Sequence, residues 1–315
     1  MNQKIKDFIR KDFGERVNGI TVLPSLGNKK LLENFYNINS KYNTICAKLL
    51  DTSNALENNS IGYDWGSWSG KIREVFKDGV PVNFLSNSLI SFTMVFKRIS
   101  GVKDTTNRIT ILEDIFSEKE LLALLLEDYI GKPIISNAKY KTSTNRTHHA
   151  THLGFYKKMT NNYFWNTESV IEFGGGYGDM ARIIRKMNQD ITYIIIDLPE
   201  LLALQYTYLG SLEGESEINI VNIDNPNIVK GKINLVPSDL VYKGKISVSA
   251  ESFISTWALS ECPEYLQEFV SSKSFFGATR LLLASFIDNN NKLKIKNIKK
   301  EIVPFLDGNH EYWTR

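Results

Sequence analysis

The chain has 315 residues, 42% of them hydrophobic, which is enough for one large core with an accessory region or for two domains. Its 38 basic and 35 acidic residues leave a net charge of +3, which does not favour a nucleic-acid partner. The two cysteines, Cys46 and Cys262, exclude a disulfide framework and a zinc-ligand spacing and indicate a reducing compartment. Charges in the first seven residues do not suit a signal peptide, and no stretch approaches the ~20 apolar residues of a membrane span. We therefore expect a cytoplasmic protein.

The first 145 residues contain no cofactor motif and one well-marked helix. Ser117 and Glu120 form a capping-box pattern directly before the apolar run 121–126. Gly131 and Pro133 are expected to stop this helix. The width of the apolar run predicts that the helix is buried on most sides.

An aromatic segment, Tyr-Asp-Trp-Gly-Ser-Trp-Ser-Gly, spans residues 63–70. Its glycines predict a flexible loop that could close as a lid, and aromatic faces stack on sugar rings or nucleobases. Trp65 and Trp68 are therefore candidate substrate contacts. Local packing is the alternative interpretation.

Three of the four histidines, His148, His149 and His152, fall within five residues. They are the only titratable cluster that could be tuned near neutrality, so His148 and His149 are candidate general bases. His148 and His152 are four residues apart and would share a helix face as a metal pair does, but no further ligands can be placed. Structural histidines are the alternative. Arg146, which precedes them, is a candidate substrate contact.

A predicted strand runs into a glycine-dense turn at Val-Ile-Glu-Phe-Gly-Gly-Gly-Tyr-Gly-Asp, residues 170–179. A dinucleotide fingerprint needs a glycine where Asp179 stands, and a carboxylate there would repel a pyrophosphate. An acid two residues before Gly-x-Gly-x-Gly is instead typical of class I S-adenosylmethionine methyltransferases. The carboxylate suits a ligand with a positive amine and a positive sulfur, and bare backbone lets the ligand approach closely. An ordinary glycine-rich turn is the alternative. The candidate cofactor contacts here are Glu172, Gly174, Gly175, Gly176 and Gly178.

The next β-branched run, residues 191–196, ends in Asp197, Leu198 and Pro199. An acid about twenty residues past the glycine loop is where α/β nucleoside-binding folds place the carboxylate for the ribose hydroxyls. Proline suits the first helical turn, so a helix is expected to follow at once. Asp197 and Leu198 are candidate cofactor contacts, with a plain helix cap as the alternative role of Asp197.

Strand and helix patterns then alternate, which predicts an α/β fold with a doubly wound, mostly parallel sheet. The tail at residues 309–314 is expected to form an antiparallel last strand. Residues 292–300 alternate basic and apolar side chains, as in a half-exposed strand or a helix face, and are either a solvated face or a guide for an anionic nucleotide-sugar. The predicted strands lie near residues 169–174, 192–197, 232–236, 252–257 and 280–287.

These blocks together resemble the sugar O-methyltransferases found in bacterial surface-glycan loci, a class I S-adenosylmethionine-dependent family. Thr256 and Trp257 depart from the Asn and the Tyr or His expected at those positions, which bears on the acceptor more than on the chemistry. The resemblance is strongest over residues 145–287. It rests on Glu-x-Gly-Gly-Gly-Tyr-Gly at 172–178, Ile-Asp-Leu-Pro-Glu at 196–200 with the helix at 201–209, and Phe-Ile-Ser-Thr-Trp-Ala-Leu-Ser-Glu at 253–261.

The resemblance implies a Rossmann-like sheet of seven strands in an S-adenosylmethionine-binding domain over residues 146–315. Residues 1–145 would form a helical N-terminal region that covers the acceptor or makes dimer contacts. The implied reaction is methylation of a sugar hydroxyl, on a nucleotide-activated sugar or a surface-polysaccharide precursor of capsule or lipopolysaccharide, with S-adenosyl-L-homocysteine as product.

Because a sugar hydroxyl is a poor acid, a base or a metal is expected, and whether a divalent ion assists stays open. Glu261 joins the two histidines as a candidate catalytic residue, with capping of the following helix as its alternative. Further cofactor contacts are Ser238, Ser255 and Thr256, and further substrate contacts are Tyr177 and Trp257.

Three alternatives remain. The first is O- or N-methylation of a non-sugar metabolite, because acceptor choice resides in loops grafted on the fold. The second is a non-catalytic methyltransferase-like binding module that partners another glycan enzyme. The third is an NAD oxidoreductase, which Asp179 disfavours. The sequence does not fix the sugar, the hydroxyl or the oligomeric state, although a homodimer is compatible with it.

Overall fold

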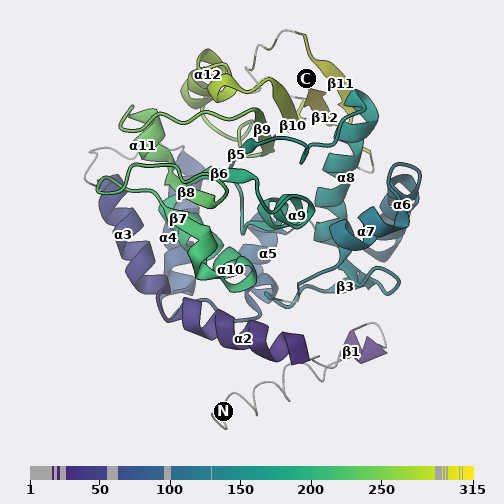
Figure 1. Ribbon diagram of the computed structural model, residues 1–315, viewed down its shortest axis with the longest axis horizontal. Coiled ribbons are helices and arrows are strands. Elements are labelled where there is room, and N and C mark those ends of the chain that lie inside the picture. The colour runs from purple at the N-terminus through teal and green to yellow at the C-terminus, as the bar shows by residue number, and fades with distance from the viewer. Residues whose placement is uncertain are drawn as a thin grey trace.

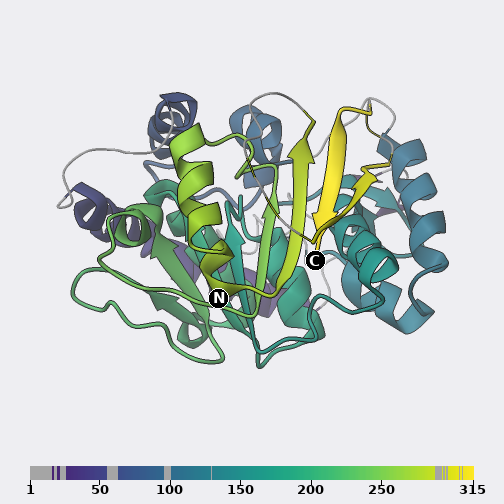
Figure 2. The same cartoon turned by 90° about the horizontal axis from the view of Figure 1, so that it is seen from above.

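The computed structural model describes residues 16–17, 20–21, 26–54, 63–95, 101–128, 130–287, 293, 295, 297–304, 306 and 308–315. Its main feature is an eight-stranded sheet with the order β11-β12-β10-β9-β5-β6-β8-β7 (Figures 1 and 2). Two short hairpins accompany it, formed by β1 (Arg16–Val17) with β2 (Ile20–Thr21) and by β3 (Ile135–Asn137) with β4 (Thr142–Ser143). The strands of the main sheet are β5 (Ser169–Phe173), β6 (Thr192–Asp197), β7 (Ile218–Ile220), β8 (Ile233–Pro237), β9 (Ser252–Thr256), β10 (Arg280–Phe286), β11 (Lys299–Ile302) and β12 (His310–Thr314).

The predicted α/β alternation is confirmed, as is the antiparallel last strand. Along the sheet, neighbouring strands in the stretch β7-β8-β6-β5-β9-β10 pair in parallel. By contrast, β12 runs antiparallel to both β10 and β11. The predicted number of seven strands is wrong by one. The additional strand is β7, which pairs in parallel with β8 at the sheet edge, with Ile218 opposite Ile233.

Helices cover both faces of the sheet, as a parallel sheet requires. Alternate residues of each strand point to opposite faces, so Val170 and Tyr193 join one hydrophobic cluster while Ile171 and Ile194 join the other. The helices that follow β5 and β6 are α9 (Asp179–Met187) and α10 (Pro199–Glu213), and α9 packs on α8 (Thr144–Thr160). The helices after β8 and β9 are α11 (Ser238–Tyr242) and α12 (Glu264–Ser272). Two short 3-10 helices complete this part, η2 (Glu215–Glu217) before β7 and η3 (Phe275–Gly277) before β10.

The N-terminal helices lie against the helical layer formed by α8, α9 and α10 (Figure 1). Three of them pack on α10, namely α2 (Leu26–Asn39), α3 (Tyr42–Asn54) and α4 (Tyr63–Val75). Next follow the 3-10 helix η1 (Phe84–Ser86) and α5 (Ser88–Met94), and then α6 (Gly101–Glu113) and α7 (Glu118–Leu125), which pack on α8. Phe35 and Leu112 of this region belong to the same core cluster as Tyr193 and Tyr312 of the sheet. The division at residue 145 therefore stays a prediction.

The capping box at the start of α7 is confirmed, because the Ser117 hydroxyl accepts from the backbone of Glu120 and the Glu120 carboxylate accepts from the backbone of Ser117. The helix ends at Leu125, earlier than Gly131. Its apolar run is not buried on most sides, since Leu122 is 48% exposed and Leu126 is 42% exposed. The helix closes two turns after its cap, and these two leucines project to solvent.

The segment 63–70 is not a loop but the first part of α4, which corrects the prediction of a flexible lid. The glycines lower its helix propensity, yet Ile72 and Phe76 lie one turn apart and are completely buried. Tertiary packing therefore outweighs local propensity here. For residues 292–300, Lys299 and Lys300 begin strand β11 with both side chains exposed, and residues 292, 294 and 296 lie outside the described part of the chain. None of the helices in the described ranges is both long and apolar enough to cross a membrane.

Candidate functional site

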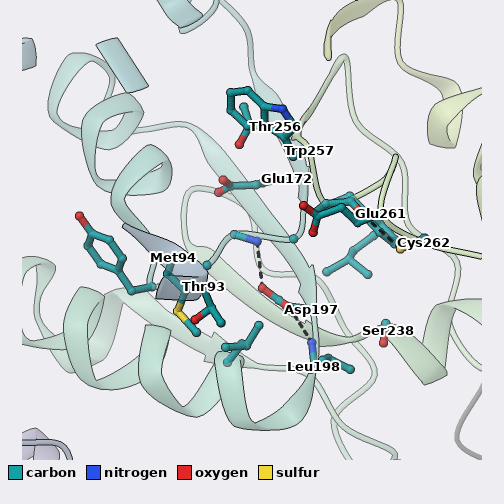
Figure 3. A pocket seen from close by; sticks show the side chains of 18 of the residues that line it. Thr93, Met94, Glu172, Asp197, Leu198, Ser238, Thr256, Trp257, Glu261 and Cys262 are labelled. Carbon is teal, nitrogen blue, oxygen red and sulfur yellow. Dashed lines mark hydrogen bonds between the residues drawn. The ribbon is translucent and has the colours of Figure 1, made fainter. Parts of the chain in front are cut away.

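A cavity of about 460 Å³ lies where β5, β6 and β9 end. The chain passes from β5 to β6 on one side and β9 lies on the other, so the loops that follow these strands diverge and leave a crevice. Thr93 and Met94 of α5 line the cavity opposite the sheet, which makes the N-terminal region part of its wall (Figure 3). Most of the predicted site residues line this one cavity.

The glycine loop presents bare backbone to this cavity. Gly174 has φ +78°, and a Cβ atom on it would lie 2.1 Å from the Cβ of Ala258. A Cβ on Gly175 would lie 2.8 Å from Ile195, so neither position tolerates a side chain without displacement. Gly176 also lines the cavity, with φ +56°. Gly178 is not among the described residues that line it and forms the N-cap of α9 with φ +101°, so its role as a cofactor contact stays a prediction.

Asp197 lies at the end of β6 and faces the cavity (Figure 3). Its Oδ2 accepts from the backbone N–H of Gly175 at 2.9 Å and from Gln205 Nε2 at 2.8 Å, and its Oδ1 accepts from the backbone N–H of Leu198 at 2.8 Å. Burial outweighs these hydrogen bonds and raises the pKa of Asp197 to about 7. The carboxylate therefore ties the glycine loop to the start of α10. Leu198 lines the cavity beside it.

Glu172 is the second-last residue of β5, is 4% exposed and also lines the cavity (Figure 3). Its Oε2 accepts from the Tyr193 hydroxyl at 2.9 Å. Burial is the main cause that raises the pKa of Glu172 to about 8, and the nearby carboxylates of Asp197 and Asp179 add to it. Two carboxyl groups with raised pKa values in one cavity suit a positively charged ligand, because a cation would stabilise their ionised forms.

Further polar groups lie after β8. Ser238 lines the cavity as predicted, and its buried Oγ has no hydrogen-bond partner among the described residues. Asp239 lines the cavity next to it, 4% exposed, and was not predicted. An acid two residues past the end of β8 is the sequence signal that could have found it. Bare backbone, buried carboxyls and an orphaned hydroxyl in one cavity fit a cationic nucleoside such as S-adenosylmethionine.

The three neighbouring histidines have different surroundings. His149 lines the cavity with its side chain 18% exposed, and its Nδ1 lies 2.7 Å from Asp179 Oδ2. His148 also lines the cavity and stacks on Trp257, with ring centroids 5.2 Å apart. His152 is completely buried, with Nδ1 2.6 Å from the Tyr312 hydroxyl, and burial lowers its pKa well below the ordinary value.

His152 is therefore a core histidine. Within the described ranges, no group of three or more metal-ligating side chains is gathered.

Arg146 is not among the described residues that line the cavity, and its role as a substrate contact stays a prediction. Its guanidinium is completely buried, and three carboxylates compensate its charge. Its Nη2 lies 2.8 Å from Asp179 Oδ1, 3.2 Å from Glu127 Oε2 and 3.2 Å from Asp128 Oδ2. These partners come from α9 and from the segment after α7, so their convergence on Arg146 could not be read from the local sequence.

Four other predicted residues line the cavity, namely Tyr177, Thr256, Trp257 and Glu261. The Tyr177 hydroxyl accepts from Asn145 Nδ2 at 2.9 Å. Trp257 has φ +65°, unusual for a residue with a side chain, and its Nε1 donates to His310 Nδ1 at 2.9 Å. His310 and Phe286 also line the cavity and were missed, because they come from the ends of β12 and β10 and carry no local motif.

The remaining predicted residues lie elsewhere. The Ser255 hydroxyl donates to the carbonyl of Phe173 and accepts from the backbone of Leu259, so it braces the loop after β9 rather than the cavity. Trp68 does not line the cavity, although its ring centroid is 5.8 Å from that of Phe92, which does. The side chain of Trp65 lies outside the described part of the structure.

No protein-family model matches this chain. No curated protein sequence matches it either. Solved structures with a similar arrangement include a mutant of MtNAS in complex with S-adenosylmethionine, at 10% identity, TM-score 0.38, and 92% coverage of this chain and 98% of that chain. A second is the magnesium protoporphyrin IX methyltransferase ChlM from Synechocystis PCC 6803 with bound S-adenosylmethionine, at 10% identity and TM-score 0.38, with 69% of this chain and 98% of that chain covered. A third is the mitomycin 7-O-methyltransferase MmcR, at 10% identity and TM-score 0.36, with 67% of this chain and 66% of that chain covered.

These are distant likenesses, and their ligands and reactions belong to those proteins. The strand order of this chain is that of a Rossmann-like, mostly parallel α/β sheet preceded by N-terminal helices, with the antiparallel β12 inserted between β10 and β11.

Proposed function

We propose that this protein is an S-adenosylmethionine-dependent methyltransferase that acts on a sugar hydroxyl. The observation that supports this most strongly is one cavity that brings Glu172 and Asp197 beside the bare glycine loop and also contains His149. The carboxyl groups and bare backbone suit the cofactor, and the imidazole suits a proton acceptor.

The cofactor would be held by groups at the ends of β5, β6 and β8. Glu172 would attract its positive charge, Asp197 would accept from the ribose hydroxyls, and Asp239 would accept from the amino group of the base. The bound cofactor supplies a methyl group already activated on a sulfonium. Leu198 and Val241, which also line the cavity, would exclude water from it.

His149 would remove the proton of the acceptor hydroxyl. It is the cavity-lining histidine whose Nδ1 contacts a buried carboxylate, so its Nε2 is the nitrogen left for the acceptor. Glu261 is the second candidate, at an exposed position on the cavity rim. His148 is less suited, because its ring stacks on Trp257.

The sugar part of the proposal rests on the family resemblance and on the aromatic side chains Tyr177, Trp257 and Phe286 in the cavity wall. The second experiment below distinguishes a nucleotide-sugar acceptor from a glycan precursor. The homodimer, the covering role of residues 1–145 and the cytoplasmic location stay predictions.

The first test is calorimetric titration of the purified protein with S-adenosylhomocysteine, with NADH titrated in parallel. Micromolar binding of S-adenosylhomocysteine alone is expected. Binding of NADH alone, or of neither ligand, would refute the cofactor assignment.

The second test measures S-adenosylhomocysteine release in the presence of nucleotide-sugars, neutral glycans, small phenols and small amines, each with and without magnesium. Turnover of a sugar is expected. Turnover of phenols or amines alone would favour a methyltransferase of non-sugar metabolites. Cofactor binding without turnover of any acceptor would favour a binding module.

A further inference from the structure

One face of α8 is docked against the junction between the glycine loop and α9. Asn145 donates to the Tyr177 hydroxyl at 2.9 Å, Arg146 pairs with Asp179 at 2.8 Å, and His149 Nδ1 lies 2.7 Å from the other oxygen of Asp179. Three side chains within one and a half turns of α8 thus contact two residues that follow Gly176. The position of His149 is therefore coupled to the loop that would hold the cofactor.

Asp179 is completely buried between Arg146 and His149. Burial opposes its ionisation, but Arg146 and His149 outweigh burial and leave the pKa of Asp179 below its ordinary value. Its place as the first residue of α9 adds to this effect, because the N-terminus of a helix favours a negative charge. The group that faces His149 is thus a carboxylate, which accepts hydrogen bonds and donates none.

The tautomer of His149 follows from this contact. A nitrogen that lies 2.7 Å from a carboxylate oxygen must carry the proton, so Nδ1 is protonated and Nε2 holds the lone pair in the neutral ring. His149 lines the cavity, whereas Asp179 is not among the described residues that do. The lone pair is therefore on the ring edge that does not face Asp179.

We propose that Asp179 and Arg146 are positioning residues that fix His149 in the Nδ1–H tautomer, with Nε2 offered to the cavity as the proton acceptor. Arg146 keeps Asp179 ionised, and Asp179 orients the imidazole. When Nε2 takes the proton of an acceptor hydroxyl, the O–H bond breaks, its electron pair stays on oxygen, and the positive charge of the imidazolium forms beside Asp179. The inference rests on the proposed function for the use of the base, but the tautomer can be measured without it.

The third part of this arrangement comes from the N-terminal region. Glu127 and Asp128, which follow α7, contact the same guanidinium nitrogen that contacts Asp179. Asp128 also pairs with Arg182 at 2.7 Å, and Arg182 pairs with Glu213 at 2.6 Å. Arg182 therefore shares the charge cluster but has no described contact with Asp179, which makes it a matched control for Arg146.

The experiment is long-range proton–nitrogen NMR of protein labelled with ¹⁵N-histidine, at a pH about 1.5 units above the ordinary imidazole pKa of ~6.5. The signals of His149 are assigned with a His149→Gln variant. The wild-type ring is expected to show a protonated Nδ1 and an unprotonated Nε2. A ring protonated at Nε2 in the wild type would overturn the proposal.

Variants then test the two positioning residues. Asp179→Asn offers an amide N–H to Nδ1 and is expected to convert His149 largely to the Nε2–H tautomer, as an asparagine does behind the histidine of a serine-protease triad. Arg146→Gln is expected to lower the population of the Nδ1–H tautomer, and Arg182→Gln is expected to leave it unchanged. If Arg146→Gln does not fold, Arg146→Lys compared with Arg182→Lys serves instead, with a shifted Nδ1 signal expected in the first variant only. Unchanged His149 signals in the Asp179 and Arg146 variants would refute the roles of these residues.

Titration with S-adenosylhomocysteine separates this inference from the proposed function. Because Asp179 is not among the described residues of the cavity wall, Asp179→Asn is expected to change the dissociation constant by less than about threefold. Once an acceptor is found, the same variant is expected to lower kcat by about 100-fold or more at an unchanged KM for the cofactor. A wild type that shows the expected tautomer but does not bind S-adenosylhomocysteine would refute the proposed function and leave the tautomer assignment intact.

Discussion

Glu172 should reduce the stability of the free protein at alkaline pH, because its carboxyl group is buried in the cavity wall. Burial raises its pKa from 4.5 to about 8. An acid whose pKa is raised on folding contributes stability that is fully present below pH 4.5 and is lost as the pH rises to about 8. Between about pH 5.5 and about pH 8.5 the loss is roughly 3 kcal/mol, at about 1.36 kcal/mol per pH unit.

The variant Glu172→Gln removes this loss. The side-chain oxygen of glutamine can still accept from the Tyr193 hydroxyl, which donates to Glu172 Oε2 at 2.9 Å, so the packing is nearly preserved. The free energy of unfolding is measured by urea denaturation of wild type and variant at both pH values. The variant is expected to gain roughly 3 kcal/mol relative to wild type between the two.

The comparison of two pH values cancels any cost of the substitution that does not depend on pH. The matched control is Glu168→Gln, because the Glu168 side chain is 82% exposed and should show no such difference. An unchanged stability difference between Glu172→Gln and wild type at both pH values would refute the reasoning. The same variant is expected to bind S-adenosylmethionine more weakly, which identifies the carboxylate as a group kept for binding rather than for stability.

Three further predictions concern the cavity. Gly174→Ala places a Cβ 2.1 Å from that of Ala258 and should lower both the melting temperature and the affinity for S-adenosylhomocysteine. Gly176→Ala, where the nearest atom to the new Cβ is 3.9 Å away, should lower both quantities less. Equal effects of the two substitutions would contradict the close approach at Gly174. Asp197→Ala should weaken S-adenosylhomocysteine binding by about ten-fold or more, in line with ~1.5 to 3 kcal/mol for a hydrogen bond to a charged group, and unchanged affinity in a folded variant would remove the ribose assignment. The affinity for S-adenosylmethionine should rise with pH up to about 8, because a cation binds the ionised forms of Glu172 and Asp197. The dissociation constant is measured by calorimetry in buffers from acidic to alkaline pH. A dissociation constant that does not change with pH would contradict the prediction.

The sequence predicted the parts of the site whose chemistry and position are both local. The acid at 172, the glycine turn and the acid at 197 follow two buried strands, and parallel strands bring their carboxyl ends to the same edge of the sheet. Their convergence therefore needs only the α/β alternation, which the sequence shows. Phe286 and His310 line the same cavity, but they depend on how far β10 and β12 extend, and no local pattern indicates that.

A charged residue near a motif does not reveal where its side chain points. The position of Arg146 beside the histidines suggests a substrate contact, whereas three carboxylates from distant segments contact its buried guanidinium. The sequence shows Asp179 only as an acid that would repel a pyrophosphate. Its partners are an arginine and a histidine about thirty residues earlier in the chain, and only the docking of α8 on α9 brings them to it.

Residues 63–70 show the same limit for secondary structure, since their glycines indicate a loop while the burial of Ile72 and Phe76 decides for a helix.

The contact between α5 and the glycine loop makes the cavity a joint product of two stretches of chain. Met94 is the nearest neighbour of a Cβ placed on Gly176, and both residues line the cavity. An exchange of residues 1–145 with those of another protein of this fold would therefore replace one wall of the cavity together with the N-terminal helices. Grafting a new acceptor preference onto this scaffold requires that α5 and the loop be chosen as a pair.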